Sequence, residues 1–532
     1  MSSQYAGYTG KVLMVDLSTE TAREYPWTDR DRKLYLGGKV MAYKILCDHL
    51  TGKEKAFSEE NWIVISTGPL TLSGAPSSVR YDISAISPAT GLPTSSNCGG
   101  DFGIYLKRAG YDALILAGRC QEHRWLEIRS DACIFHEAQD LWGTLCEDCR
   151  QLLDQKIQEK KYGRLYIGPA GENCVRYASI LDGTHTSGRS GIGAVLGWKN
   201  LKAVTVSGNL PLPVHDPQRS TQYKKEWFQE LYAHPYTGPN SRSGKPTSKA
   251  CPGCPILCRR QFNKGADSQT DLFNQLGMDS VSAQDTVAWA VYAAQQGVLT
   301  QPLPEEEKLF ADIAHRRGIG DDLAEGIKYL SKKYDCLLPK KSKSAADKHN
   351  RNDGYPALLA GWGLDPETMS PGEKLDCAIL YMDLCEAVSA SGLCMFTVNA
   401  FCPAFLIHQP DCAKARLVHN LIPKSGWLIH AIVRNPKLLF LPLSLFRQIK
   451  LLYSVSGLNL APGQFLEVGS RSFLLEQMLV HRFGGDTGKL PKMLAKTPDD
   501  TTGARYFAVR NWDNNGIPTA TAKKRLHISS GE

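Results

Sequence analysis

The chain has 532 residues, 42% of them hydrophobic and 22% charged, a composition typical of globular proteins and a length that suits roughly two to four domains. Its net charge of +8 and pI near 8.6 are modest for this length, and its lysine clusters lack interleaved aromatic residues. The charge therefore favours a solvated basic surface, with a docking face for an acidic electron-transfer partner as the second interpretation, and argues against nucleic-acid binding.

The first 210 residues contain short β-type runs between turns rich in glycine and proline, and few long amphipathic helices. The sequence LPLPV at 210–214 is typical of a linker. We therefore predict a β-rich N-terminal domain over 1–212, with strands at 11–17, 62–66, 113–116, 165–167 and 203–206.

From about residue 215 the pattern becomes helical. Apolar spacing predicts a helix at 280–296 that ends at Gly297, and further helices at 305–316, 321–333, 373–388 and 464–483. No internal repeat is evident. The predicted fold class is α+β, with the β-rich N-terminal domain followed by two mostly α-helical domains at 213–355 and 356–532.

The N-terminal sequence MSSQYAGYTGKVLMVD has no apolar signal-peptide core. The apolar stretch at 438–445 is too short to cross a bilayer and contains Pro442. We therefore expect a cytoplasmic protein without a membrane span. Its 16 cysteines do not indicate a disulfide framework, and most should be small buried hydrophobic residues, which leaves a few as candidate metal ligands.

The strongest chemical signal is CPGCPILC at 251–258, where Cys251, Cys254 and Cys258 have C-x2-C-x3-C spacing. Short gaps let the thiolates reach different iron corners of a [4Fe–4S] cluster, and prolines stiffen the loop. The fourth ligand must come from elsewhere. Cys394, in the sequence SGLCMF, is the best candidate.

A zinc site and the absence of any metal are the competing interpretations. Structural zinc prefers two similar C-x2-C knuckles, and the other such spacing, Cys146 and Cys149, suggests ordinary surface cysteines on a helix. Arg259 and Arg260 directly follow the first motif and could offset the negative charge of an iron–sulfur cluster. We therefore favour iron and sulfur.

Three glycine-rich stretches in the N-terminal part could bring backbone amides close to an anion. They cover 68–81, 96–103 and 168–197, and Arg80 and Arg189 could add positive charge. None of them matches a Walker A or a Rossmann fingerprint. Since most glycine-rich turns only reverse a β chain, each stretch is a weak signal by itself.

Taken together, these features resemble the tungsten-containing aldehyde:ferredoxin oxidoreductase family. The resemblance implies a β-rich base that cradles two pterin dithiolenes, with tungsten or molybdenum between them and two mostly helical domains above. It also implies a cluster beside one pterin that passes electrons out to ferredoxin or to an iron–sulfur partner subunit. The similar segments are 10–16, 68–118, 168–208, 251–297, 318–325, 383–396 and 506–518.

The resemblance also implies site residues. The family motifs D-x-x-G-L-D and D-x-x-G-L-C correspond here to NQLGMD at 274–279 and SASGLC at 389–394, and the second supports Cys394 as the fourth cluster ligand. Backbone oxygens of Asn97 and Thr186 would bind a Mg²⁺ ion that bridges the two pterin phosphates. The residues expected at the pterin cofactor are Arg80, Asn97, Gly99, His185, Thr186, Gly188, Arg189, Asn274, Met278, Asp279, Ser389 and Leu393.

The chain departs from the family pattern in several places. Asn274 and Ser389 replace the aspartates that open the two pterin motifs, and His185 replaces an arginine. The segments between 258 and 274 and between about 335 and 380 lack the glutamate and the histidine that face the substrate in the family. Because aldehyde oxidation needs a positioned acid or base, no catalytic residue is assigned.

Two functions follow from these observations. The first is a tungstopterin oxidoreductase that removes two electrons from an aldehyde or a similar small carbonyl substrate. The second is a non-catalytic relative that serves as an electron-transfer or assembly subunit, and a zinc-stabilised binding module is the weakest interpretation. Either of the first two could form a homo- or hetero-oligomer.

Overall fold

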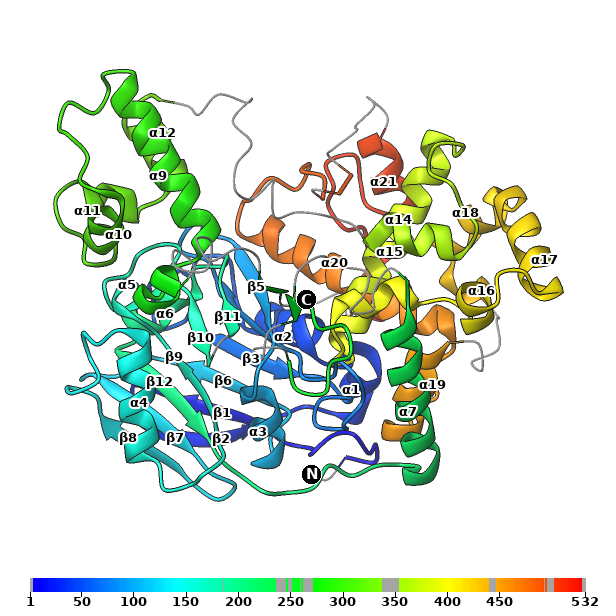
Figure 1. Ribbon diagram of the computed structural model, residues 1–532, viewed down its shortest axis with the longest axis horizontal. Helices are drawn as coiled ribbons and strands as arrows, with labels where there is room; N and C mark the ends of the chain where they lie inside the picture. The colour runs from blue at the N-terminus through cyan, green and yellow to red at the C-terminus, as the bar shows by residue number, and fades with distance from the viewer. Residues whose placement is uncertain are drawn as a thin grey trace.

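The computed structural model describes residues 3–183, 185–235, 251–258, 271–336, 354–439, 446–491, 493–494 and 502–528, together with the backbone of 245–246 and 260–261. Its N-terminal part contains two mixed sheets of six strands each (Figure 1). The first has the order β2 (Thr21–Tyr25), β1 (Val12–Asp16), β6 (Ala113–Ala117), β3 (Ile63–Thr67), β4 (Tyr81–Ile86), β5 (Pro93–Cys98). The second has the order β11 (His185–Ser187), β10 (Ile180–Asp182), β9 (Gly163–Tyr166), β12 (Leu201–Val206), β7 (Arg124–Ile128), β8 (Cys133–Glu137).

Alternate residues of the central strands face two different apolar cores. On β1, Leu13 and Val15 belong to the core between the two sheets, whereas Val12 and Met14 belong to the core between the first sheet and the helices that cover it. Burial on both faces explains why β6 is apolar throughout and why β1 and β3 begin with apolar runs. The strands expected in the N-terminal part are present as β1, β3, β6, β9 and β12, and the α+β fold class is confirmed.

Helices cover the free faces of both sheets. The helix α2 lies on β3 and β4 of the first sheet, and α4 packs on the outer face of the second sheet against Trp125 and Tyr166. The bounds of the helices in this part are α1 (Asp29–Tyr35), α2 (Gly38–His49), α3 (Phe102–Arg108), α4 (Cys146–Lys156), α5 (Pro169–Glu172) and α6 (Ile192–Trp198).

A first helical group rises above α5 and α6 and consists of α9 (Ser280–Gln295), α10 (Glu306–Ala314), α11 (Ile319–Ala324) and α12 (Ile327–Lys333) (Figure 1). Its apolar residues share one core with α5 and α6 of the β-rich part. The single helix predicted at 321–333 is wrong, because the chain turns at Gly326, whose φ of +81° is rarely adopted by residues with a side chain.

A second helical group covers the other face of the first sheet. In it α15 packs along α20, and both contact α2. The helix α7 (Pro217–Ala233) also lies here, beside α19, although the predicted domain boundaries place it with the first group; those boundaries stay predictions. The bounds are α14 (Gly354–Gly361), α15 (Pro371–Ala390), η2 (Met395–Ala400), α16 (Ala404–His408), α17 (Ala413–Leu421), η3 (Ile422–Lys424), α18 (Gly426–Arg434), η4 (Pro436–Leu438), α19 (Arg447–Ser456), α20 (Pro462–Arg482), α21 (Thr502–Arg510) and α22 (Ala520–Arg525).

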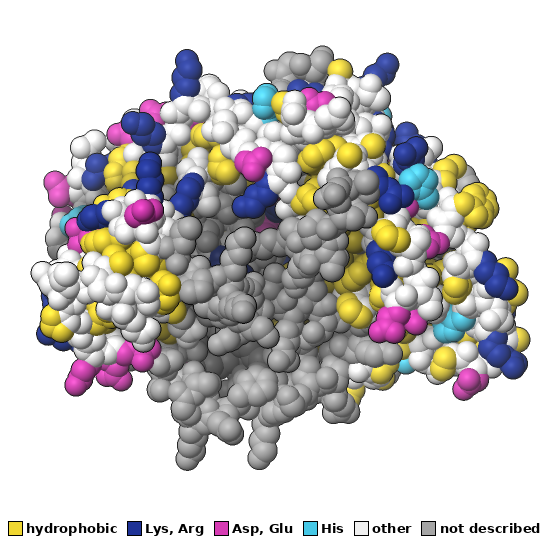
Figure 2. Space-filling model, turned by 90° about the horizontal axis from the view of Figure 1, so that it is seen from above, with side chains coloured by type: hydrophobic (Ala, Val, Ile, Leu, Met, Phe, Trp, Pro, Cys, Tyr) yellow, Lys and Arg dark blue, Asp and Glu magenta, His cyan; other side chains and the backbone are white. Residues whose placement is uncertain are grey.

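The described part of the chain can be characterised by the apolar character of its helices and by its distribution of surface charge. No helix in the described ranges combines the length and the apolar character that crossing a bilayer requires. On the face shown in Figure 2, the Lys and Arg side chains of the described residues are scattered among acidic and apolar ones. This distribution agrees with the modest net charge of the sequence.

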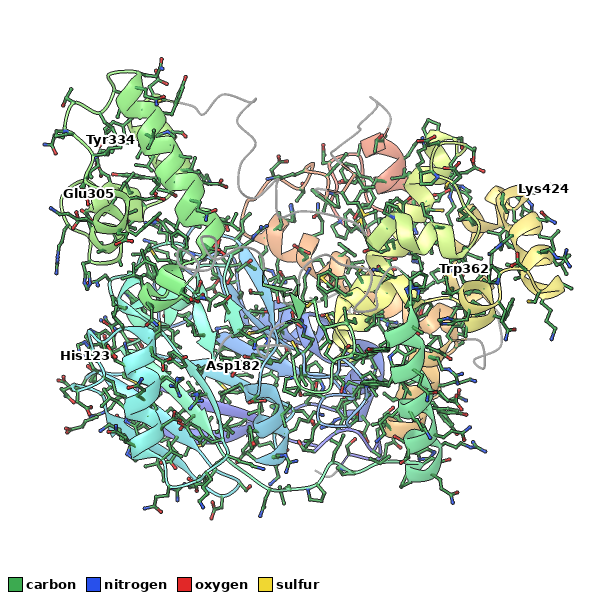
Figure 3. The ribbon with its side chains drawn as sticks, viewed as in Figure 1. His123, Asp182, Glu305, Tyr334, Trp362 and Lys424 are labelled. Carbon is green, nitrogen blue, oxygen red and sulfur yellow. The ribbon has the colours of Figure 1, made fainter. Side chains whose placement is uncertain are left out.

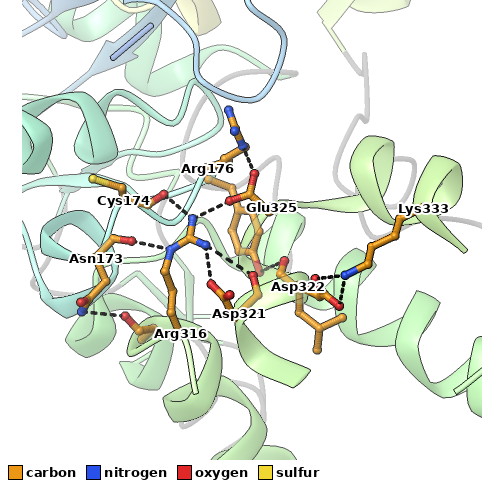
Figure 4. A network of polar contacts seen from close by, with 11 residues as sticks. Asn173, Cys174, Arg176, Arg316, Asp321, Asp322, Glu325 and Lys333 are labelled. Atoms are coloured by element: carbon orange, nitrogen blue, oxygen red, sulfur yellow. Dashed lines mark hydrogen bonds and ion pairs between the residues drawn. The ribbon is translucent and has the colours of Figure 1, made fainter. Parts of the chain in front are cut away.

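One arginine ties the first helical group to the β-rich part (Figure 4). Arg316, just after α10, donates to the carbonyl oxygens of Asn173 at 2.6 Å and Cys174 at 2.9 Å. Its guanidinium also pairs with Asp321 and Glu325, each at 2.8 Å, and Glu325 in turn pairs with Arg176. These bonds fix α10 and α11 against the loop that follows α5.

We expect Arg316→Met to loosen this helical group. Removing the guanidinium leaves two carbonyl oxygens and Asp321 without this donor and leaves Glu325 with Arg176 alone, which should cost about 2 kcal/mol of local stability. Hydrogen exchange at 306–333 should accelerate. The control is Lys333→Met, because Lys333 pairs with Asp322 at the surface and such pairs stabilise little. Unchanged exchange in the Arg316 variant would contradict this account of the network.

Candidate metal centre

The loop of residues 389–394 closes directly onto the backbone of the first glycine-rich stretch. Leu70 N donates to Ser391 O at 2.9 Å, and Cys394 N donates to Ser77 O at 2.9 Å. A Cβ on Gly68 would overlap the Gly392 nitrogen, so the two chains approach more closely than side chains allow. The loop at the end of α15 is therefore held against the start of β4 by backbone contacts.

The loop of residues 274–279 closes onto the third stretch in the same way. Ser179 N donates to Gly277 O at 2.8 Å, and Asp279 N donates to Tyr177 O at 3.0 Å. A Cβ on Gly277, whose φ is +74°, would lie 2.7 Å from Gly168 N. The same closure thus occurs twice, once on each sheet, although no internal repeat is visible in the sequence.

The edge strands of the two sheets, β5 and β11, contact each other. Asn97 on β5 donates through Nδ2 to Ser389 Oγ at 3.1 Å and to Asp82 Oδ2 at 3.2 Å. A Cβ on Gly188, just after β11, would lie 2.7 Å from Asp279 Oδ1. Each edge strand therefore meets the motif loop of its own half, through Asn97 and Ser389 on the first sheet and through Gly188 and Asp279 on the second.

Other expected cofactor residues contribute to this region differently. Met278 and Leu393 are buried in the helical cores, at 1% and 0% exposure, and so anchor their loops. Asp279 accepts from Ser282 N at 2.9 Å and caps α9. Within the same turn, Gly277 N donates to the carbonyl oxygen of Asn274 at 3.2 Å.

Cys251, Cys254, Cys258 and Cys394 line one small cavity, together with Ser77, Val79, Arg80, Ile256 and Phe396. Three of the thiols contact polar side chains: Arg80 Nη2 donates to Cys394 Sγ at 3.5 Å, Ser77 Oγ lies 3.1 Å from Cys254 Sγ, and His185 Nε2 lies 3.2 Å from Cys251 Sγ. The structure therefore brings Cys394 into the same cavity as the other three cysteines.

Gly99 directly follows β5 and lies between the cysteine cavity and His185 of β11. A Cβ at this position would lie 2.9 Å from Cys251 Sγ, 3.1 Å from Arg80 Nη1 and 3.2 Å from His185 Cδ2. The absence of a side chain at Gly99 is what lets the thiol, the guanidinium and the imidazole converge. Three of the residues expected at the pterin cofactor, Arg80, Gly99 and His185, thus adjoin the cysteine cavity.

The electrostatics of the cavity suit an anionic metal cluster. Burial raises the pKa of Cys251 to about 12, although Arg80 opposes this, so a thiolate here needs a cation. Burial lowers the pKa of Arg80, but the thiols of Cys394 and Cys251 outweigh this and raise it, which keeps the guanidinium charged. Four thiols and one fixed positive charge could hold an iron–sulfur cluster.

The arrangement is less suited to a single zinc ion. Within the described ranges, no three His, Cys, Asp or Glu side chains converge on one ion position. Cys146 and Cys149 lie on α4 as expected, but they are buried in an apolar core rather than on the surface, because α4 packs its apolar side on the second sheet. They therefore offer no second zinc knuckle.

Two buried carboxyl groups beside the edge strands were missed by the sequence analysis. Asp82 lies opposite Asn97 in the pairing of β4 with β5, and Asp182 lies opposite His185 in the pairing of β10 with β11. Burial raises the pKa of Asp82 to about 6 and that of Asp182 to about 7. An aspartate inside an apolar strand is the sequence signal that could have identified both.

Asp182 is held inside the β-rich part (Figure 3). Its Oδ2 accepts from Tyr81 Oη and from Phe102 N, each at 2.9 Å. An unfolded aspartate has a pKa of about 3.9, so ionisation of Asp182 disfavours the folded state increasingly as pH rises from about 4 to about 7.

We expect Asp182→Asn to remove this pH dependence, because the amide oxygen can accept the same hydrogen bonds without a charge. The melting temperature of the variant should exceed that of the wild type by more at pH 8 than at pH 5. Asp131→Asn, at an exposed bend, is the control. A difference between Asp182→Asn and wild type that stays constant from pH 5 to pH 8 would contradict the raised pKa.

Some residues of interest lie outside the described part of the chain. They are Arg259, the segment 262–270 and the segment 337–353, in which the family's substrate-facing residues were not found. Among the described histidines of the second helical group, His430 pairs with Asp376 at 2.8 Å and His419 Nε2 lies 3.4 Å from Gly361 O. Neither touches the cysteine cavity, whose lining contains no residue of α17 or α18.

Two family models match the chain. The model described as "Aldehyde ferredoxin oxidoreductase, N-terminal domain" covers residues 12–208, and the model for "domains 2 & 3" of the same family covers 268–528. Among solved structures, the active site complex BamBC of benzoyl coenzyme A reductase with 1,5-dienoyl-CoA has a TM-score of 0.74 at 21% identity and covers 99% of this chain and 98% of its own. This likeness concerns the fold alone.

Curated relatives include tungsten-containing aldehyde ferredoxin oxidoreductases. The protein of Pyrococcus horikoshii is 29% identical over 498 residues, which is 74% of this chain and 82% of the relative. That of Thermococcus kodakarensis is 27% identical over 624 residues, or 97% and 98% of the two chains. A protein of Pyrococcus furiosus described as "Aliphatic sulfonate oxidoreductase, WOR-like subunit" is 29% identical over 60% of this chain and 66% of its own.

Proposed function

The chain belongs to the aldehyde ferredoxin oxidoreductase family, which supports a tungstopterin oxidoreductase, and on that basis we propose that it oxidises an aldehyde or a similar small carbonyl compound. Electrons would leave through a [4Fe–4S] cluster to ferredoxin or to an iron–sulfur partner subunit. The observation that carries the proposal is the cavity shared by Cys251, Cys254, Cys258 and Cys394 beside the two motif loops.

The four cysteines would hold the cluster, and backbone oxygens of Asn97 and Thr186 would hold Mg²⁺ between the edge strands. When bound, the metal–pterin group supplies two-electron redox chemistry and the cluster supplies one-electron transfer. The pterins would be held by Arg80, Asn97, Gly99, His185, Thr186, Gly188, Arg189, Asn274, Met278, Asp279, Ser389 and Leu393.

The chain's own groups prepare the site for these cofactors. Arg80 places a buried positive charge beside Cys394, which lowers the cost of gathering thiolates there. Asn97 and Ser389 already hydrogen-bond one another, so their polar atoms are oriented before a cofactor binds. The apolar walls of the cavity, the buried Val79 and Ile256 and the half-buried Phe396, limit the access of water to the thiols.

A second candidate is a non-catalytic electron-transfer or assembly subunit. The alignment with the Thermococcus relative spans 624 positions, more than the 532 residues of this chain, so the relative contains segments that this chain lacks. The segments where the family's acid and base were not found are the natural place for such a loss. The Pyrococcus furiosus relative described as a WOR-like subunit fits the same interpretation.

Metal analysis of anaerobically purified protein tests the cofactor set. We expect about four iron atoms per chain together with tungsten or molybdenum. Cys394→Ser should lose most of the iron, because three thiolates hold a cubane cluster poorly. Cys402→Ser is the matched control, since Cys402 is also buried but lies in a separate apolar cluster. Iron without tungsten or molybdenum would contradict the pterin proposal.

A dye assay separates the two candidates. If the chain is itself an oxidoreductase for carbonyl compounds, the purified protein should reduce a viologen dye when short aliphatic or aromatic aldehydes are added. The Cys394→Ser variant should be much slower, because electron exit would be interrupted. A wild-type protein that contains all its metals but reduces no dye would favour the subunit interpretation.

A further inference from the structure

His185 stands at the boundary between the cysteine cavity and the edge strands. It begins β11, where it pairs with Asp182 of β10. Its Nε2 lies 3.2 Å from Cys251 Sγ, and its Cδ2 would lie 3.2 Å from a Cβ on Gly99. The imidazole therefore packs against Gly99, and its Nε2 faces the thiol of Cys251.

The resemblance places an arginine at this position, in a loop that it assigns to the pterin cofactor, whereas this chain has a histidine. The imidazole has a shorter reach and a planar ring, which fits over the side-chain-free Gly99. A neighbouring arginine, Arg80, already supplies positive charge to the same cavity. Compared with the family pattern, this chain has the imidazole of His185 beside Cys251 in place of a second arginine.

The direction of the hydrogen bond follows from the chemistry of the ligand. A cysteine that binds iron does so as a thiolate, which has no proton to donate. The atom that faces it must then be the donor, so Nε2 carries the hydrogen whenever Cys251 is bound to iron.

We propose that His185 is a positioning residue that donates a hydrogen bond to the Cys251 thiolate and thereby raises the reduction potential of the cluster. This rests on the proposed function, in which Cys251 is a cluster ligand. One-electron reduction adds negative charge to the cluster and its thiolates, while the proton stays on Nε2 and no bond in the chain breaks. A donor to a ligand sulfur stabilises the reduced form more than the oxidised form.

Two other side chains of the cavity also contact cysteine sulfurs. Arg80 lies 3.5 Å from Cys394 Sγ and Ser77 lies 3.1 Å from Cys254 Sγ, so His185 adds a third side-chain contact at a third sulfur. Burial strengthens each of these bonds because little water competes for the sulfurs. The reduction potential should therefore respond to the loss of any one donor.

The test compares cluster potentials by redox titration of anaerobically reconstituted full-length protein, followed by electron paramagnetic resonance. His185→Phe keeps a ring but removes the donor and should lower the midpoint potential. His185→Gln retains an N–H donor and should restore much of it. His136→Phe is the control, because His136 stacks on Trp125 and hydrogen-bonds Glu127 in the second sheet, away from the cysteine cavity. This variant should leave the cluster potential unchanged.

A cluster in His185→Phe with normal iron content and an unchanged potential would overturn the inference and leave the proposed function standing. A wild-type protein without any cluster signal would overturn the proposed function instead. Should the Phe variant fail to fold, wild-type protein with ¹⁵N-labelled histidine decides the matter. The reduced cluster should show a weak ¹⁵N coupling and an exchangeable proton; no coupling, or one strong enough for a directly bound nitrogen, would refute the donor role.

Discussion

The close approach of two pairs of backbones is the constraint on which the site depends. Gly392 lies against Gly68, and Gly277 lies against Gly168, at separations that a side chain would forbid. These contacts draw the ends of the helical segments down to the sheet edges. Cys394 can line the cysteine cavity only because its loop is bonded to Ser77 in this way. A methyl group at any of the four glycines would push the motif loop outward.

The two closures share a geometry but end in different chemistry. The loop of the first sheet ends in Cys394, whose thiol faces the cavity and the buried charge of Arg80. The loop of the second sheet ends in Asp279, whose Oδ2 caps α9 by accepting from the backbone N and the hydroxyl of Ser282. One backbone arrangement thus serves both as a metal-facing loop and as the start of a helix. The two loops thus share a backbone arrangement and differ in their last residue, which is Cys394 in one and Asp279 in the other.

Much of the fold could be predicted because the sequence carries local signals for it. Strands such as β1 and β6 are short apolar runs bounded by turns, and α9 has both a capping aspartate and a terminal Gly297. The strands β5 and β11 are not predicted, because their residues are polar, they overlap the glycine-rich stretches at 96–103 and 168–197, and only long-range pairing makes them strands. Pairing of this kind leaves little local trace.

The site could be predicted only in part, for a similar reason. The spacing of Cys251, Cys254 and Cys258 is a local pattern, whereas Cys394 needed the family pattern to select it. The contact between His185 and Cys251, and the burial of Asp82 and Asp182, depend on segments distant in sequence. Composition and periodicity contain no information about such contacts. The repeated closure on Gly68 and Gly168 was hidden because its two copies share almost no residues beyond glycine.

The path of the chain also sets an order for making the protein. The segment 251–258 follows α7, which rests on α19, and precedes α9, which rests on the β-rich part. During synthesis from the N-terminus, its three cysteines appear well before Cys394 and before α19 exists to receive α7. The last of the four cysteines, Cys394, is translated long after Cys251, Cys254 and Cys258, so the cavity cannot be completed on a nascent chain before that point. A cofactor that needs all four thiols can therefore be fully bound only after residue 394 of the 532 has been made.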